Sequence, residues 1–134
     1  MEFDLHNNVD DRVAVATQAV ASETLIVGAI IDTLDYESLE YIIQAVVITT
    51  GTVSFILEEG DDSGLSDAAV VPADEVLGAL TGFLVTDDTS TKRVGSIGKK
   101  RYQRLSLQPA GTAAIDFLGA CAVLGNPKSG PVDQ

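Results

Sequence analysis

Few side chains in this sequence are of types that could act as a base or a nucleophile. His6 is the only histidine, and it lies in an acidic N-terminal stretch that we expect to be solvent-exposed rather than catalytic. Cys121 is the only cysteine, and the apolar segment AIDFLGACAVL around it holds no cation that would favour a reactive thiolate. We therefore expect Cys121 to be a packed core residue. One cysteine cannot close an internal disulfide, and with one histidine it is too little for a zinc site.

Motifs that mark common active sites are missing as well. The sequence has no G-x-S-x-G elbow, no G-x-x-x-x-G-K-[ST] phosphate loop and no G-x-G-x-x-G dinucleotide fingerprint. Glycoside hydrolysis would need paired carboxylates around a sugar, and a chain with three tyrosines, four phenylalanines and no tryptophan offers little to stack on one. We expect a protein that is not an enzyme, with no catalytic residue and no cofactor.

An acidic segment at residues 58–67, EEGDDSGLSD, concentrates carboxylates in a turn-rich stretch. Calcium prefers such hard oxygen ligands, but the spacing does not match the D-x-[DN]-x-[DN]-G calcium loop. A solvated or partner-facing acidic turn is favoured over a calcium site, and we expect no metal. The carboxylates are Glu58, Glu59, Asp61, Asp62 and Asp67.

A basic segment at residues 92–104, KRVGSIGKKRYQR, places six cations in thirteen residues. Three interpretations are open: a solvated strand edge protected by Lys and Arg, contact with an acidic protein surface, or a nucleic-acid patch. Protein contact is favoured, because Arg101 and Arg104 can form bidentate pairs with carboxylates and a net charge of −12 opposes binding to phosphate. The candidate partner-binding residues are Lys99, Lys100, Arg101, Arg104, Glu58, Glu59, Asp61 and Asp62.

Charge is unevenly distributed along the chain. Residues 1–91 hold one basic residue against eighteen acidic ones, whereas residues 92–134 hold seven basic residues against two acidic ones. This pattern suggests an acidic and a basic surface for different neighbours, unless folding interleaves the two.

The length and composition of the chain indicate what kind of fold positions these side chains. The chain has 134 residues, of which 46% are hydrophobic, so we expect one folded domain. No apolar run is long enough to span a bilayer, and the acidic start MEFDLHNNVDD does not resemble a signal peptide. We expect a soluble protein made in the cytoplasm.

Alternating hydrophobicity predicts strands throughout the N-terminal half. Residues 12–20 place Val13 and Val15 on one face, and residues 25–31 form a second strand with a bulge at Gly28. Residues 39–49 and 52–59 read as a hairpin around Gly51, although a helix over 36–48 is the competing interpretation. The expected core residues of this hairpin are Tyr41, Ile43, Val53, Phe55 and Leu57.

The C-terminal half continues the pattern. Strands are expected at 94–97, 102–107 and 113–124, while 68–91 fits either a short helix after Pro72 or two short strands around Gly78 and Gly82. Tyr102 differs in parity from Leu105, which requires either a bulge near Gln103 or Tyr102 on the opposite face.

These elements predict an all-β sandwich or jelly roll of about eight short antiparallel strands with at most one short helix. The domain is expected over residues 1–125, with residues 126–134 as an extended or flexible arm.

The order of segments resembles that of small structural proteins in the head modules of tailed bacteriophages. The resemblance lies in the acidic EExDDS loop, the basic strand VGSIGKKRYQRLSL and the closing strand AVLGNPKSGP, and it covers residues 25–65 and 94–131. It implies a capsid cement, or decoration, protein that binds the outside of a shell of major capsid protein in the virion and reinforces it. Such proteins often act as homodimers or homotrimers at junctions between capsomers, which leaves no role for nucleic acid or membrane.

Two other functions stay open at this point. A head–tail joining or tail component would differ from a cement protein in copy number and ring symmetry. A calcium- or carbohydrate-binding β-sandwich module is supported only by the acidic segment.

Overall fold

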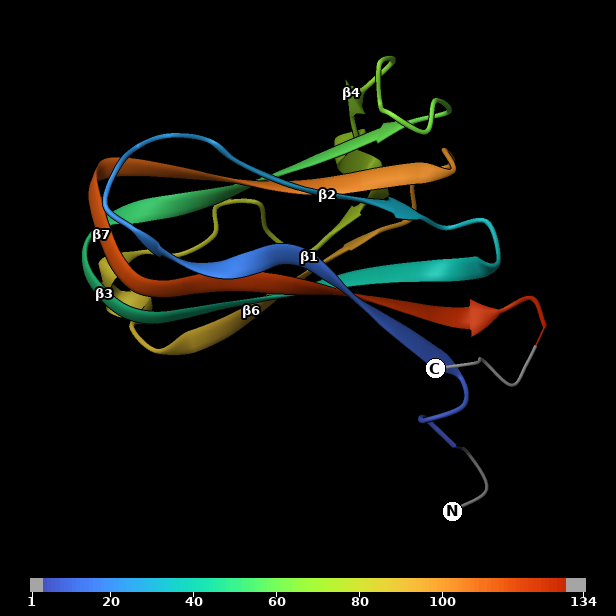
Figure 1. The fold of residues 1–134 in the computed structure, drawn as a ribbon, viewed down its shortest axis with the longest axis horizontal. Coiled ribbons are helices and arrows are strands. Elements are labelled where there is room, and N and C mark those ends of the chain that lie inside the picture. The colour runs from blue at the N-terminus through green and yellow to red at the C-terminus, as the bar shows by residue number, and fades with distance from the viewer. Residues whose placement is uncertain (1–3, 130–134) are drawn as a thin grey trace.

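Two long strands organise the structure, a computed structural model that describes residues 4–129. β3 (Tyr36–Gly60) and β7 (Tyr102–Pro127) pair antiparallel along almost their whole lengths, from Tyr36 opposite Pro127 to Gly60 opposite Tyr102. Figure 1 shows that both strands double back at one end, so that each contributes to both layers of an all-β sandwich. The fold class predicted from the sequence is therefore confirmed.

The bend in this ribbon lies where backbone with positive φ occurs on both strands. Val47 (φ 56°) and Gly51 (φ 86°) bend β3, and Gly111 (φ 71°) and Thr112 (φ 56°) bend β7. A Cβ on Gly51 would lie 2.5 Å from the Cα of Ala113, so only glycine fits there. The register also shifts on either side of Thr50, as bulges at a bend require.

The hairpin predicted around Gly51 is therefore wrong. Residues 39–49 and 52–59 belong to one strand, and each half pairs with β7 rather than with the other half. The expected strands at 102–107 and 113–124 are likewise two halves of β7. Glycine with positive φ bends a continuous strand here instead of ending it, which a pattern of turn residues does not distinguish.

The shorter strands complete the two layers. One layer holds β1 (Val9–Val20), residues 115–127 of β7, residues 36–48 of β3, β6 (Ser90–Ser96) and β5 (Val76–Leu77). The other layer holds β2 (Ile26–Asp32), residues 102–109 of β7, residues 52–60 of β3 and β4 (Ala69–Val70). Every pairing is antiparallel.

The ambiguous stretch 68–91 contains both kinds of element that the sequence left open. Its helical parts are two single 3₁₀ turns, η1 (Ala73–Glu75) and η2 (Val85–Asp87), and its strands are β4 and β5. Phe83 exchanges backbone hydrogen bonds with Val53 and packs edge-on against Phe55 with 5.7 Å between ring centroids. Among residues 4–129, no helix is long and apolar enough to cross a membrane.

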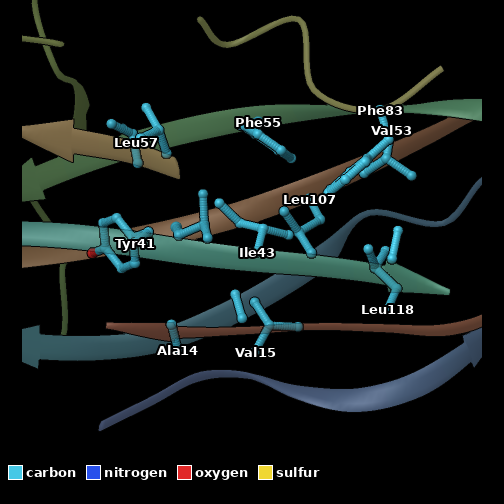
Figure 2. Packing of buried hydrophobic residues seen from close by; sticks show 14 of the residues in the cluster. Ala14, Val15, Tyr41, Ile43, Val53, Phe55, Leu57, Phe83, Leu107 and Leu118 are labelled. Carbon is cyan, nitrogen blue, oxygen red and sulfur yellow. The ribbon is translucent and has the colours of Figure 1, made fainter. Parts of the chain in front are cut away.

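The core lies between the layers and contains all five predicted residues. Tyr41, Ile43 and Val53 are fully buried, and Phe55 and Leu57 are at most 3% exposed. Figure 2 shows Phe55 and Leu57 on one layer and Tyr41 and Ile43 facing them from the other. The period-two prediction is confirmed, but the bend in β3, not a hairpin, brings the two groups together.

Two strands depart from regular alternation. In β1 the register shifts between Val13 and Val15, so Val15 is buried while Val13 is 66% exposed, and the prediction that they share a face is wrong. In β2 the register shifts between Val27 and Ile30, which confirms the bulge expected at Gly28. Gly28 is required because a Cβ there would lie 2.0 Å from a carbonyl oxygen of β7.

The expected bulge near Gln103 is absent from β7, where residues 102–110 pair in unbroken register with β3. Gln103 is 3% exposed and Tyr102 is half-buried, so Tyr102 lies on the opposite face, the second of the two interpretations.

Part of the expected C-terminal arm is held by the sandwich. β7 ends at Pro127, and Lys128 donates its backbone N–H to the Asp35 carbonyl (2.9 Å) and its Nζ to the Leu34 carbonyl (2.8 Å). Residues 130–134, the rest of the expected arm, lie outside the described residues, as do residues 1–3.

Candidate interaction surfaces

The acidic and basic segments lie side by side and pair with each other. Glu58 and Arg104 are directly opposite in the β3–β7 register, and Arg104 donates to one Glu58 oxygen from Nε (3.0 Å) and Nη2 (2.6 Å). Both side chains are largely buried, which strengthens their attraction relative to an exposed pair. Lys100 forms an ion pair with Asp61, which raises the pKa of Lys100.

Glu59 belongs to a buried polar network. It is 8% exposed and accepts hydrogen bonds from Gln103 Nε2 (3.1 Å) and the Lys100 backbone N–H (3.3 Å). Gln103 Oε1 in turn accepts a hydrogen bond from Ser96 Oγ (3.1 Å). A Cβ on Gly98 would lie 2.2 Å from a Glu59 carboxylate oxygen, so the glycine leaves the space that this carboxylate fills. The role shown for Glu59 is structural.

The remaining carboxylates of the acidic segment close the loop after β3. Asp67 accepts hydrogen bonds from the backbone N–H groups of Asp61 (2.8 Å) and Asp62 (3.1 Å), and Asp62 accepts from Gly64 (3.0 Å) and Ser66 (3.2 Å). These bonds hold the pKa values of Asp67 and Asp62 below the ordinary aspartate value, since they favour the charged form. No cluster of three or more metal-ligating side chains occurs within residues 4–129.

The other cations of the basic segment are mostly paired inside the chain too. Arg101 holds Asp32 through two parallel hydrogen bonds (2.8 and 2.7 Å), and this guanidinium keeps the pKa of the Asp32 carboxyl below its usual value. Lys99 pairs with Glu75 (3.4 Å) and Lys92 with Asp87 (3.1 Å). Arg93 is exposed and has no ion pair in the part of the chain that the structure describes.

The fold therefore interleaves the two charge groups instead of presenting them on separate surfaces. The charge distribution along the chain suggested separate surfaces because sequence distance hides the antiparallel pairing of β3 with β7. A role of these eight residues toward a partner stays a prediction.

The two candidate chemical side chains lie apart. His6 is exposed in a turn before β1. Cys121 is half-buried on the outside of its sheet, so the prediction that it packs in the core is wrong. The inward positions of this stretch of β7 are taken by its neighbours in alternation, Ala120 and Ala122.

An apolar surface surrounds Cys121 on the outside of the β1–β7–β3–β6 sheet. We call it the outer sheet face and define it by five of its apolar residues, Val13, Ile42, Val46, Phe117 and Cys121. They line a shallow hollow of about 510 Å³, and Phe117 and Val13 are 56% and 66% exposed. Gly119 also lines the hollow, and Thr17 packs closely over it, since a Cβ on Gly119 would lie 2.7 Å from Thr17 Oγ1.

A second apolar surface belongs to the other layer. Leu25, Val27 and Ile30, which we call the β2 strip, are 42%, 57% and 36% exposed. Within residues 4–129, β2 pairs as a strand only with β7, and no strand pairs with its other edge. Exposed apolar side chains on a free strand edge are typical of a surface that another chain covers.

Neither apolar surface was identified from the sequence. A signal for the outer sheet face is present in FLGACAVL, residues 117–124, where both alternating sets are small or apolar, as in a strand covered on both sides.

Comparisons with known proteins give no assignment for these surfaces: no protein-family model matches the chain, and a search of curated proteins finds no match.

Proposed function

We propose that this protein is a capsid cement, or decoration, protein of a tailed bacteriophage. It binds the outside of the major capsid protein shell and stabilises that shell by cross-bridging capsomers. The proposal rests on the resemblance of the EExDDS, IGKKRYQRL and VLGNP segments together with the surfaces described above.

The observation that carries the proposal is the presence of two separate apolar surfaces on one small sandwich. The outer sheet face lies on one layer and the β2 strip on the other. Apolar side chains at the centre of an interface supply much of the binding energy when another protein covers them. A bridging protein needs two such contact areas, and this chain offers two.

The charged segments support this function by stiffening the sandwich. The Arg104–Glu58 pair joins β7 to β3, and the Arg101–Asp32 pair joins the start of β7 to the end of β2. A rigid body loses less conformational entropy on docking than a flexible one, so these pairs favour binding.

Binding to empty, DNA-free shells of the encoding phage tests the proposal. Val27→Lys should weaken co-sedimentation with shells at least about tenfold, because it places a charge in an apolar contact. Leu84→Lys is the matched control: Leu84 is 50% exposed, close to the 57% of Val27, but lies outside both surfaces. Failure of the wild-type protein to bind shells, or equal binding by Val27→Lys, contradicts the proposal.

Two further measurements separate the alternatives. Wild-type protein should show negligible affinity for DNA, because its net charge is −12. Counting copies per virion distinguishes a shell protein, present in many copies, from a joining component restricted to one small ring.

A further inference from the structure

We propose that the outer sheet face is a two-fold self-association surface. Two copies of the chain pack these faces together, with the symmetry axis parallel to the strands and between β7 and β3. This geometry places β7 of one copy over β3 of the other and β1 of one copy over β6 of the other.

The apolar centre of the face suits this arrangement. β7 and β3 are adjacent in the sheet, with Phe117 opposite Val46 and Cys121 opposite Ile42 in the register. The two-fold axis therefore brings Phe117 of one copy against Val46 of the other, and Cys121 against Ile42. Apolar side chains thus meet apolar side chains on both sides of the axis, and the hollow that they line leaves room for interdigitation.

Charge at the rim identifies a second copy as the occupant. Arg93 lies at the β6 end of the face and Asp11 at the β1 end, and both are exposed. No ion pair involves either side chain within the described range 4–129. β7 and β3 separate β1 from β6 in the sheet order, so Arg93 and Asp11 are roughly 14 Å apart across the sheet within one chain, three strand spacings, and are offset by two residues along the strands.

The two-fold axis along the strands brings each Arg93 over the β1 end of the other copy, within reach of Asp11. An axis across the strands would instead place β6 over β6 and bring the two Arg93 side chains together. Opposite charges at the two ends of one apolar face are thus self-complementary in only the first arrangement.

This inference deepens the proposed function and rests on it for the role of the β2 strip. The outer sheet face joins two copies, and the dimer offers its two β2 strips to neighbouring capsomers. Self-association is measured on the purified full chain alone, so its failure and a failure of shell binding are distinguishable.

Sedimentation velocity over a range of concentrations, with reductant present, tests the inference. The wild-type chain should show a species of twice its 14.0 kDa mass that dissociates on dilution. Phe117→Lys should raise the dimer dissociation constant at least about thirtyfold. Val27→Lys is the matched control, since Val27 is 57% exposed and Phe117 56%, and it should leave the dimer unchanged.

A charge swap distinguishes this geometry from any other use of the face. Arg93→Asp and Asp11→Arg should each weaken the dimer several-fold, and the double variant should recover most of the loss. Rescue requires contact between copies, because the two positions are too far apart to pair within one chain.

A wild-type chain that stays monomeric up to about 100 μM overturns the inference. A dimer unaffected by Phe117→Lys overturns it as well. Additive losses in the double charge variant would overturn the axis along the strands. Circular dichroism spectra matching the wild type confirm that each variant is folded.

Discussion

The charged end of the sandwich and the outer sheet face differ in whether their side chains find partners within the chain. At the charged end, Arg104 pairs with Glu58, Arg101 with Asp32, and Gln103 bonds the buried Glu59. On the outer sheet face, Phe117 and Val13 are more than half exposed with nothing covering them. The charged segments thus pair mostly with each other within the chain, while a strand of apolar and small residues carries the uncovered apolar surface.

The difference follows from how much free energy charged and apolar side chains gain from contacts within one chain. A half-buried charge needs a partner within the chain, because leaving it unpaired costs about 1–2 kcal/mol, and more where burial is complete. A partly exposed valine or phenylalanine on a sheet costs far less in the isolated chain and becomes favourable only when another surface covers it.

The strongest test of the charged end is Gln103→Leu. This variant removes a side chain that bonds Glu59, Ser96 and the Lys100 carbonyl in a buried site. We expect a loss of about 3 kcal/mol in the free energy of unfolding, measured by urea titration, because Glu59 loses a donor where water is excluded. Gln108→Leu, on the same strand but half-buried, is the control and should cost less than about 1 kcal/mol. Equal losses in the two variants would mean that the buried network around Glu59 stabilises the fold no more than a half-buried glutamine does.

Arg104→Ala should have the next largest effect. It leaves Glu58 largely buried without its cation, so we expect a loss of about 1–2 kcal/mol in urea unfolding. Exchanging the two charges, Glu58→Arg with Arg104→Glu, should restore part of this stability because the cross-strand pair reforms. If the exchange costs more free energy of unfolding than the two single changes together, the Arg104–Glu58 pair does not stabilise the fold.

A smaller effect should appear on acidification. The pKa values of Asp62 and Asp67 are lowered in the folded chain, so the unfolded chain binds protons more readily at acidic pH. Their contribution to stability is complete above the unfolded aspartate pKa near 4 and is lost as pH falls through the folded values. Asp67→Asn should therefore flatten the fall of the urea midpoint between about pH 5 and pH 2.5.

Asp74→Asn is the control for this experiment, since Asp74 is an exposed aspartate outside the acidic segment. It should leave the acid profile as in the wild type. A profile for Asp67→Asn that also matches the wild type would show that the hydrogen bonds to Asp67 do not stabilise the loop.

The smallest expected effect on stability is that of Phe117→Lys. Phe117 is 56% exposed, so the free energy of unfolding of the dilute chain should change by less than about 0.5 kcal/mol. Together with the loss of self-association expected for the same variant, this would separate binding from folding. A loss comparable with that of Gln103→Leu would mean that Phe117 belongs to the core.

Alternation along single strands predicted the core well because burial follows the local pleat. Tyr41, Ile43, Val53, Phe55 and Leu57 were placed correctly from parity alone. Gly51 was assigned to a hairpin turn because a glycine between two apolar runs is common to turns and to bends within a strand. Only the pairing of both halves with β7 distinguishes the two, and that pairing joins residues distant in sequence.

The candidate surfaces were harder to predict for the same reason. Arg104 and Glu58 are 46 positions apart, and the sequence alone does not show that they lie opposite each other. Cys121 was expected in the core because its neighbours are apolar, but a strand with apolar residues on both faces gives no parity by which to tell inside from outside.

The rate at which Cys121 is alkylated, measured against protein concentration, tests most directly that the outer sheet face is exposed in one chain and covered by another. Cys121 is half-buried beside the hollow, and it is the only cysteine of the chain. The account predicts a measurable rate in dilute protein that falls as concentration rises and stays high for Phe117→Lys at every concentration. A thiol that reacts only in denaturant, or a wild-type rate that does not change with concentration, would contradict it.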